Sequence, residues 1–227
     1  SAAEALNNTI MTFVDEGDEV IVLTPAFISY KCLVNMCGAK YIDIPMDPEK
    51  GFQVDLEQVK AAITDKTKML ILNNPSNPTG AVFSKESLAE LCKLAVEKNF
   101  LVLADEIYSR LVYDGAEFHS VASFPGMREH AIVISGFSKT FAMTGWRVGF
   151  SASNDELAKA MSSYLSHSTG APSTISQWAA VEALSGQQET IEDMRKVFEE
   201  RRNYIVKRMN SIPGVSCIMP DGAFYVM

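Results

Sequence analysis

The chain has 227 residues and a formal net charge of −8, with 47% hydrophobic and 21% charged residues. This balance is ordinary for a globular protein that buries a sizeable core. Proteins that bind nucleic acids or anionic membrane surfaces in general are usually basic, so the acidic balance disfavours both partners. We also see no apolar run long enough to span a membrane.

The four cysteines are Cys32, Cys37, Cys92 and Cys217. A zinc site built on Cys32 and Cys37 would need a second close pair, which the sequence lacks, so we expect no metal site. Unpaired cysteines tend to be buried, so we expect free and mostly buried thiols. Free thiols are typical of a reducing compartment, and we expect a cytoplasmic protein.

Short apolar segments alternate with amphipathic segments over the first two-thirds of the chain. The expected helices are 2–14, 28–37, 55–63 and 84–99, with Asp55 and Ser84 as N-caps of the last two. The expected strands are 19–24, 39–46, 68–74, 100–106, 130–135 and 147–153. This alternation predicts an α/β fold with three layers (α/β/α) and a mostly parallel sheet that is buried on both faces.

The last third of the chain is mainly helical, with expected helices at 155–168, 173–186 and 188–212. The last of these is long and highly charged, so we expect it to lead toward a second domain. "GAFYVM" at 222–227 has the pattern of a strand. We therefore predict a large domain over 1–185, a connecting helix over 186–212 and, over 213–227, the beginning of a small α+β domain that a longer protein would complete.

Polar segments follow four of the predicted strands. They are Thr24 to Phe27, "NNPSNPTG" at 73–80, "DEIY" at 105–108 and "SGFSK" at 135–139. Ligands of open α/β sheets bind at the carboxyl ends of the strands. We therefore expect these four segments to converge on one edge of the sheet and to form the site there.

Three charged side chains near that edge could take part in ligand binding or in a reaction. Lys139 lies in a small, apolar stretch, where desolvation favours the neutral amine that forms Schiff bases. Asp105 ends a buried strand, where a carboxylate is costly unless a cationic or protonated group meets it. Arg147 carries a fork of donors suited to a phosphate. Taken singly, each also has a structural interpretation: a turn lysine, a capping aspartate and an ion-paired arginine.

Together, the motifs resemble a known family. The run Gly136-Phe137-Ser138-Lys139, followed by Ala142, Gly145 and Arg147-Val148-Gly149, is similar to the pyridoxal-phosphate attachment signature of class I/II aminotransferases. "NPSNPTG" and "DEIY" resemble two further signatures of that family, in the same order. The resemblance covers essentially the whole chain and implies the large domain of a fold type I enzyme of the aspartate/aromatic aminotransferase type, with pyridoxal 5'-phosphate as cofactor.

The resemblance implies how matched residues hold the cofactor ring. Lys139 would form the Schiff base, and Asp105 would pair with the protonated pyridine nitrogen. Tyr108 and Asn77 would hydrogen-bond the phenolic oxygen. Phe27 would stack on the ring face, where relatives often carry Trp or Tyr.

The cofactor phosphate would be held where the first helix begins. The contacts implied there are Ser1, Ala2, Ala3 and Arg147, because helix N-termini bind anions. Gly136 stands where the family usually has a phosphate-binding serine, so we expect Ser135 or Ser138 to supply a hydroxyl. Asn77–Pro78 and Thr24–Pro25 match peptide bonds that are cis in relatives.

The implied activity is a ping-pong transfer of an amino group between an L-amino acid and a 2-oxo acid, by a homodimer. "GDEVIVLTPAFISY" and "FAMTGWRVGF" resemble the aspartate/aromatic subgroup, which favours 2-oxoglutarate as acceptor. Two alternatives remain open: a C–S β-lyase or related synthase on the same cofactor domain, and a catalytically incompetent cofactor-binding fragment. In relatives the arginine that grips the substrate α-carboxylate lies beyond Met227, so we expect little turnover from this chain alone.

Overall fold

The computed structural model describes residues 1–227 and contains a six-stranded sheet with the order β2-β1-β3-β4-β5-β6. The strands are β1 (Glu19–Thr24), β2 (Lys40–Pro45), β3 (Thr67–Asn73), β4 (Leu101–Asp105), β5 (Ala131–Gly136) and β6 (Gly149–Ala152). The first five run parallel to their neighbours, and β6 pairs antiparallel with β5. The predicted α/β fold with a mostly parallel sheet is confirmed.

Seven α-helices accompany the sheet. They are α1 (Ala2–Phe13), α2 (Ile28–Met36), α3 (Leu56–Ala62), α4 (Lys85–Lys98), α5 (Asp155–His167), α6 (Thr174–Ser185) and α7 (Glu189–Asn210). Both predicted N-caps are confirmed, since Asp55 accepts from the backbone N–H of Glu57 and Ser84 from that of Ser87. None of the helices is both long and apolar enough to cross a bilayer.

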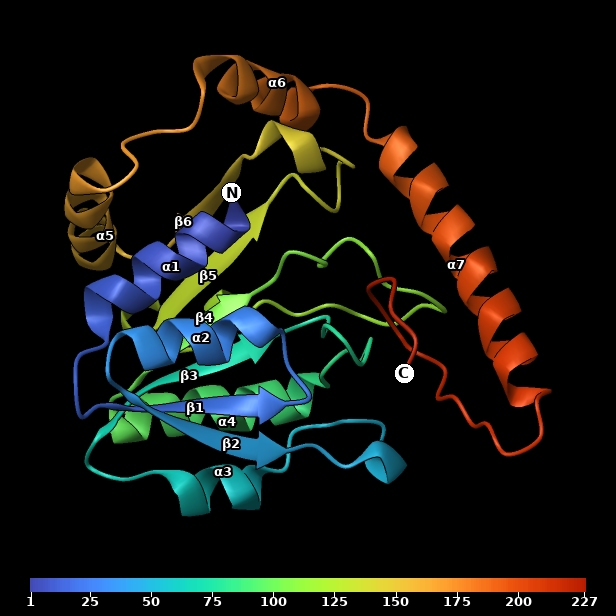
Figure 1. The fold of residues 1–227 in the computed structure, drawn as a ribbon, viewed down its shortest axis with the longest axis horizontal. Coiled ribbons are helices and arrows are strands. Elements are labelled where there is room, and N and C mark those ends of the chain that lie inside the picture. The colour runs from blue at the N-terminus through green and yellow to red at the C-terminus, as the bar shows by residue number, and fades with distance from the viewer.

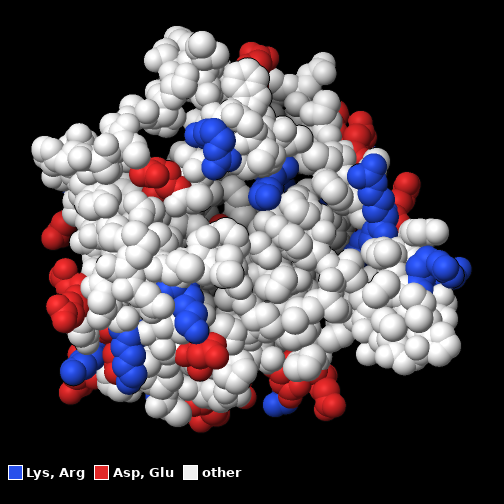
Figure 2. Space-filling view, in the orientation of Figure 1, with Lys and Arg blue, Asp and Glu red and all other residues white.

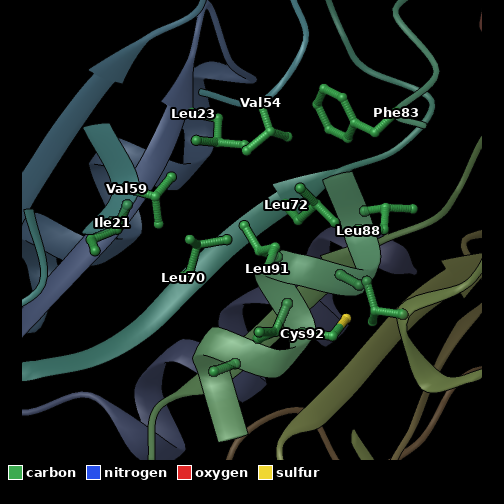
Figure 3. Close-up of a cluster of buried hydrophobic side chains, with 14 of the residues drawn as sticks. Ile21, Leu23, Val54, Val59, Leu70, Leu72, Phe83, Leu88, Leu91 and Cys92 are labelled. Carbon is green, nitrogen blue, oxygen red and sulfur yellow. The ribbon is translucent and has the colours of Figure 1, made fainter. Parts of the chain in front are cut away.

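Helices cover both faces of the sheet, so the predicted three layers are present (Figure 1). On one face, α3 and α4 bury side chains against the strands, and Leu91 and Cys92 of α4 lie close to Leu70 of β3 (Figure 3). On the other face, α1 and α2 form a second apolar cluster that includes Ile10 and Val34. Because both faces are covered, the carboxyl edge of the strands is left as the place where a ligand can enter.

The C-terminal part leaves the sheet and then returns to it. Helix α7 stands to one side of the sheet in Figure 1, and the chain after it turns back toward the loops that follow β3 and β4. We call residues 220–225 the strap. The backbone N–H groups of Gly222 and Ala223 donate to the carbonyls of Gly80 and Leu111, each at 2.8 Å.

The strand predicted at 222–227 is wrong. Only one isolated antiparallel bridge forms there, between Val112 and Gly222. The backbone groups of this segment bond to two separate loops, so no regular ladder can develop. The division into a large domain, a connecting helix and the start of a small domain stays a prediction.

All four cysteines are free, as predicted, but the expectation that most are buried is wrong. Cys92 is buried, Cys32 is exposed, and the other two are intermediate. Cys32 is exposed because α2 turns Tyr30 and Val34 toward the sheet and leaves the opposite side of the helix facing solvent.

Candidate active site

A pocket of about 190 Å³ lies at the carboxyl edge of the strands, beside the start of α1. The four polar segments all contribute to its lining: Phe27, Asn73, Asn77, Asp105, Tyr108, Ser138 and Lys139. Figure 2 shows a hollow near the middle of this face, with basic side chains beside it and mainly uncharged atoms around it. The segments that were expected to converge on one edge therefore do so.

Nearly all of the predicted site residues line this pocket. They are Ser1, Ala2, Ala3, Phe27, Asn77, Asp105, Tyr108, Ser138, Lys139 and Arg147. Ser135 is the exception, because it lies within β5, paired with Phe150 of β6, and is not among the lining residues. Ser138 is thus the only one of the two serines that lines the pocket. The Thr24–Pro25 and Asn77–Pro78 peptide bonds are cis, as predicted, and so is Asn74–Pro75.

Asp105 is the buried acid at the base of the pocket. Its side chain accepts a hydrogen bond from the Tyr30 hydroxyl at 2.8 Å and another from the backbone N–H of Ile107 at 3.3 Å. Burial raises the pKa of Asp105 from 3.8 to about 6, and these two hydrogen bonds and the charge of Lys139 oppose the rise. The groups around the carboxylate therefore do not offset the cost of burying its charge, and a cation beside it would stabilise its ionised form.

Lys139 approaches the same pocket from the turn after β5. The amine lies 5.2 Å from the ring centroid of Phe224 and 5.9 Å from that of Tyr108. Lys139 itself is half-buried. A primary amine beside aromatic faces and across from a buried carboxylate is well placed to react with a carbonyl compound in the pocket.

Tyr108 provides a hydroxyl group in the lining of the same pocket. It is buried, and its oxygen lies 2.6 Å from the hydroxyl oxygen of Tyr225 in the strap. Burial raises the pKa of Tyr108 well above its ordinary value of 10.0. Tyr108 therefore keeps its proton at neutral pH and can donate it to an acceptor in the pocket.

The start of α1 and the turn at Arg147 form the remaining wall. The backbone nitrogen of Ser1 donates to the carbonyl of Arg147 at 3.2 Å, and the Ser1 hydroxyl accepts from the N–H of Glu4. Arg147 is exposed and donates to the Thr144 carbonyl at 2.8 Å, so most of its donors remain free. Free helix amides next to a guanidinium suit an anion such as a phosphate.

The sequence reasoning did not name several lining residues, and three of them hydrogen-bond to Asp105 or Tyr108. Asn73 donates to the Asp105 carbonyl at 2.9 Å and accepts from the N–H of Asn77 at 2.6 Å, so it ties two of the motifs together. Its place in "NNPSNPTG" was a usable signal. Tyr30 follows Phe27 by one helical turn, which was a weaker signal. Tyr225 had none, because its contact with Tyr108 spans 117 residues of the sequence.

Comparison with known proteins decides the family. The model of the family described as aminotransferase class I and II matches residues 1–227, the full length of the chain. The chain belongs to the class I and II aminotransferases. An aspartate aminotransferase of Bacillus sp. (strain YM-2) is 43% identical over 227 residues, and an aspartate/prephenate aminotransferase of Thermus thermophilus is 42% identical over the same length.

Solved structures of aminotransferases share the fold. An aromatic aminotransferase from Pyrococcus horikoshii superposes with a TM-score of 0.96 at 39% identity and is matched over 61% of its own chain. The match takes in 100% of the present chain. The Bacillus and Thermus relatives are each matched over 58% of their length, so the chain spans less than two-thirds of them.

Class I and II aminotransferases use pyridoxal phosphate, and the residues of this pocket fit that molecule. The buried Asp105 carboxylate, whose pKa is raised, suits a protonated pyridine nitrogen, and the Tyr108 hydroxyl suits a phenolic oxygen. The α1 amides and Arg147 suit a phosphate, and the Lys139 amine suits an aldehyde. Each of these four groups of the cofactor therefore has a complementary residue in the lining.

Gly149 sets how closely the sheet approaches the phosphate end of this pocket. A Cβ added at Gly149 would overlap the backbone nitrogen of Ala2 and lie 2.7 Å from the carbonyl carbon of Ser1. Both are backbone atoms, so a Gly149→Ala variant must move the start of α1. We expect the free energy of unfolding to fall by about 1–3 kcal/mol and the Kd for pyridoxal phosphate to rise.

Gly145 provides the matched control for this prediction, because a Cβ there meets no atom within 4 Å. Urea unfolding and a cofactor titration followed by visible absorbance would compare the two variants. Equal behaviour of Gly149→Ala and Gly145→Ala would show that this close approach does not shape the pocket.

Proposed function

We propose that the protein transfers amino groups between an L-amino acid and a 2-oxo acid, with pyridoxal phosphate bound through Lys139. The observation that carries the proposal is that the Lys139 amine and the buried Asp105 carboxylate, from the ends of neighbouring strands, line one pocket. When bound, the cofactor supplies an aldehyde and a ring that accepts electrons from a substrate carbon.

The chain's own residues then have distinct tasks. Lys139 would hold the cofactor through its aldehyde, and its free amine would act as the general base that takes the proton from the substrate Cα. Asp105 stays ionised opposite the ring nitrogen and keeps that nitrogen protonated. Tyr108 and Asn77 hold the phenolic oxygen, and Phe27 packs on the ring face.

The phosphate end is assigned to the start of α1. The proposed contacts there are Ser1, the amides of Ala2 and Ala3, Ser138 and Arg147. Ser135 lies outside the lining, which supports Ser138 as the serine that supplies the hydroxyl.

For the substrates we propose aspartate or an aromatic amino acid as donor, with 2-oxoglutarate as acceptor. The support is that the relatives above are named aspartate, aspartate/prephenate and aromatic aminotransferases. A C–S β-lyase would use the same Lys139 and Asp105 but would lose a sulfur group after the proton leaves. We rank it second because no relative described above carries such a name.

We further propose a homodimer in the cytoplasm. Helix α6 carries four large apolar side chains that are exposed: Ile175, Trp178, Val181 and Leu184. Trp178 alone is 71% exposed, which is unusual for so large an apolar side chain unless a partner covers it. Four free thiols support a reducing compartment.

The test is a product assay on the purified protein supplied with pyridoxal phosphate. We expect a visible cofactor band that borohydride bleaches. We also expect L-glutamate to form from L-aspartate and 2-oxoglutarate, at a low rate when this chain is assayed alone. Mass spectrometry of the reduced protein should place the cofactor on the peptide that carries Lys139. Release of pyruvate and a thiol from a C–S substrate would favour the lyase. A cofactor band without any product would favour the catalytically incompetent cofactor-binding fragment.

A further inference from the structure

The strap is held tightly against the loops that form the pocket. A Cβ added at Gly80 would overlap Pro220 of the strap, and one added at Gly222 would lie 2.8 Å from Pro75. The strap therefore packs closely on the "NPSNPTG" turn, with proline rings against the backbone of the two glycines. Such contacts leave it little room to shift relative to the pocket.

Helix α7 fastens the strap from the other side. Arg202 is buried and donates to the Pro220 carbonyl at 2.9 Å and to the Asp114 carboxylate at 2.6 Å. Tyr113 donates its hydroxyl proton to the Ala223 carbonyl. Phe198 of α7 stacks on Phe224, with 5.3 Å between ring centroids.

These anchors place one aromatic side chain of the strap, that of Tyr225, in the pocket. Tyr225 lines it, and its hydroxyl oxygen lies 2.6 Å from that of Tyr108. The rings of Tyr108 and Tyr225 meet edge to face at 5.7 Å. Neither residue has an exposed ring that could turn away freely, because Tyr108 is buried and Tyr225 is half-buried.

We propose that Tyr225 is a positioning residue, which orients the Tyr108 hydroxyl so that its proton points at the phenolic oxygen of the bound cofactor. The inference rests on the proposed function and adds to it a residue from the far end of the chain. A hydroxyl has one proton and two lone pairs. If Tyr225 donates to Tyr108, the Tyr108 proton is left for the pocket, and the donation also polarises it.

The consequence is a directed pair of hydrogen bonds, from Tyr225 to Tyr108 and from Tyr108 to the cofactor. Removing the Tyr225 hydroxyl leaves the ring packing intact but frees the Tyr108 proton to turn elsewhere. The hydrogen bond from the Tyr108 hydroxyl to the phenolic oxygen of the cofactor then weakens. That hydrogen bond stabilises the more negative, deprotonated form of the bound chromophore. A weaker hydrogen bond should therefore raise the pH at which the chromophore titrates.

The experiment compares Tyr225→Phe with a matched Tyr204→Phe variant in the purified protein. Tyr204 lies on α7 and is 69% exposed, so the same chemical change there should have no effect. Three quantities are measured: the Kd for pyridoxal phosphate, the pH midpoint of the visible absorption of the bound cofactor, and the melting temperature. For Tyr225→Phe we expect the Kd to rise about 2- to 10-fold and the midpoint to rise by about half a pH unit.

The outcomes separate the two proposals. If the unmodified protein binds the cofactor and Tyr225→Phe matches it in both Kd and midpoint, the positioning role is wrong and the proposed function stands. A lower melting temperature with an unchanged midpoint would likewise overturn it, because a purely structural residue would behave that way. If the unmodified protein shows no cofactor band, both proposals fall together.

Discussion

Replacement of Lys139 by alanine should lower the rate of amino transfer by about 10²- to 10⁴-fold through loss of the proton acceptor alone. The amine lies over Tyr108 and Phe224 at the pocket mouth, and no other lysine is among the lining residues. No neighbouring amine can therefore take over the transfer. Single-turnover conversion of L-aspartate, followed through the cofactor absorbance, measures the step directly.

Two further variants separate the chemistry of Lys139 from its charge. Lys139→Arg keeps a positive charge but cannot act as a neutral nucleophile at neutral pH, so it should be about as impaired as Lys139→Ala. Lys159→Ala removes an exposed lysine on α5 and should leave the rate unchanged. A Lys139→Ala protein that keeps the rate within tenfold would exclude this lysine as the general base.

The carboxyl edge of the sheet could be predicted from the sequence because its signals are local. Apolar runs ending in Asp105 or in "SGFSK" identify both a strand and what stands at its end. In a parallel sheet those ends share one edge whatever the order of the strands. Lys139, Asp105, Asn77 and Phe27 therefore meet without any knowledge of the loops between them.

The strap could not be predicted, because its conformation depends on distant contacts. "GAFYVM" alternates like a strand, yet its backbone N–H groups bond to Gly80 and Leu111, which lie in separate loops. The contact between Tyr108 and Tyr225 spans 117 residues and leaves no periodic signal in the sequence. The choice between Ser135 and Ser138 likewise needed the register of β5 against β6.

Asp105→Asn should reduce activity and yet stabilise the cofactor-free protein at pH 8. Loss of the carboxylate leaves the proposed ring cation buried without its partner, which costs about 3–5 kcal/mol, or about 10²- to 10⁴-fold in rate. Without cofactor, the same substitution should stabilise the protein at pH 8. Burial raises the pKa of Asp105 from 3.8 to about 6, so the folded state binds the proton more tightly than the unfolded state does.

The free energy of unfolding of the cofactor-free protein must therefore fall as the pH rises from about 4 to about 6, by up to about 3 kcal/mol from this group. Asparagine at 105 has no such titration, so its variant should keep at pH 8 the stability that the unmodified protein loses. Urea unfolding at pH 4.5, 6 and 8, with and without pyridoxal phosphate, measures the effect. A variant less stable than the unmodified protein at pH 8 without cofactor would contradict it.

Glu106→Gln is the matched control, because Glu106 is the next residue and is equally buried. Burial raises its pKa from 4.5 to about 7, but its carboxylate accepts from the Ser120 hydroxyl and the Val121 N–H, away from the pocket. The glutamine variant should therefore also weaken the loss of stability with rising pH while keeping its activity within a few-fold. If both variants lost activity alike, the loss would come from disturbing the end of β4, and the assignment of Asp105 to the ring nitrogen would fail.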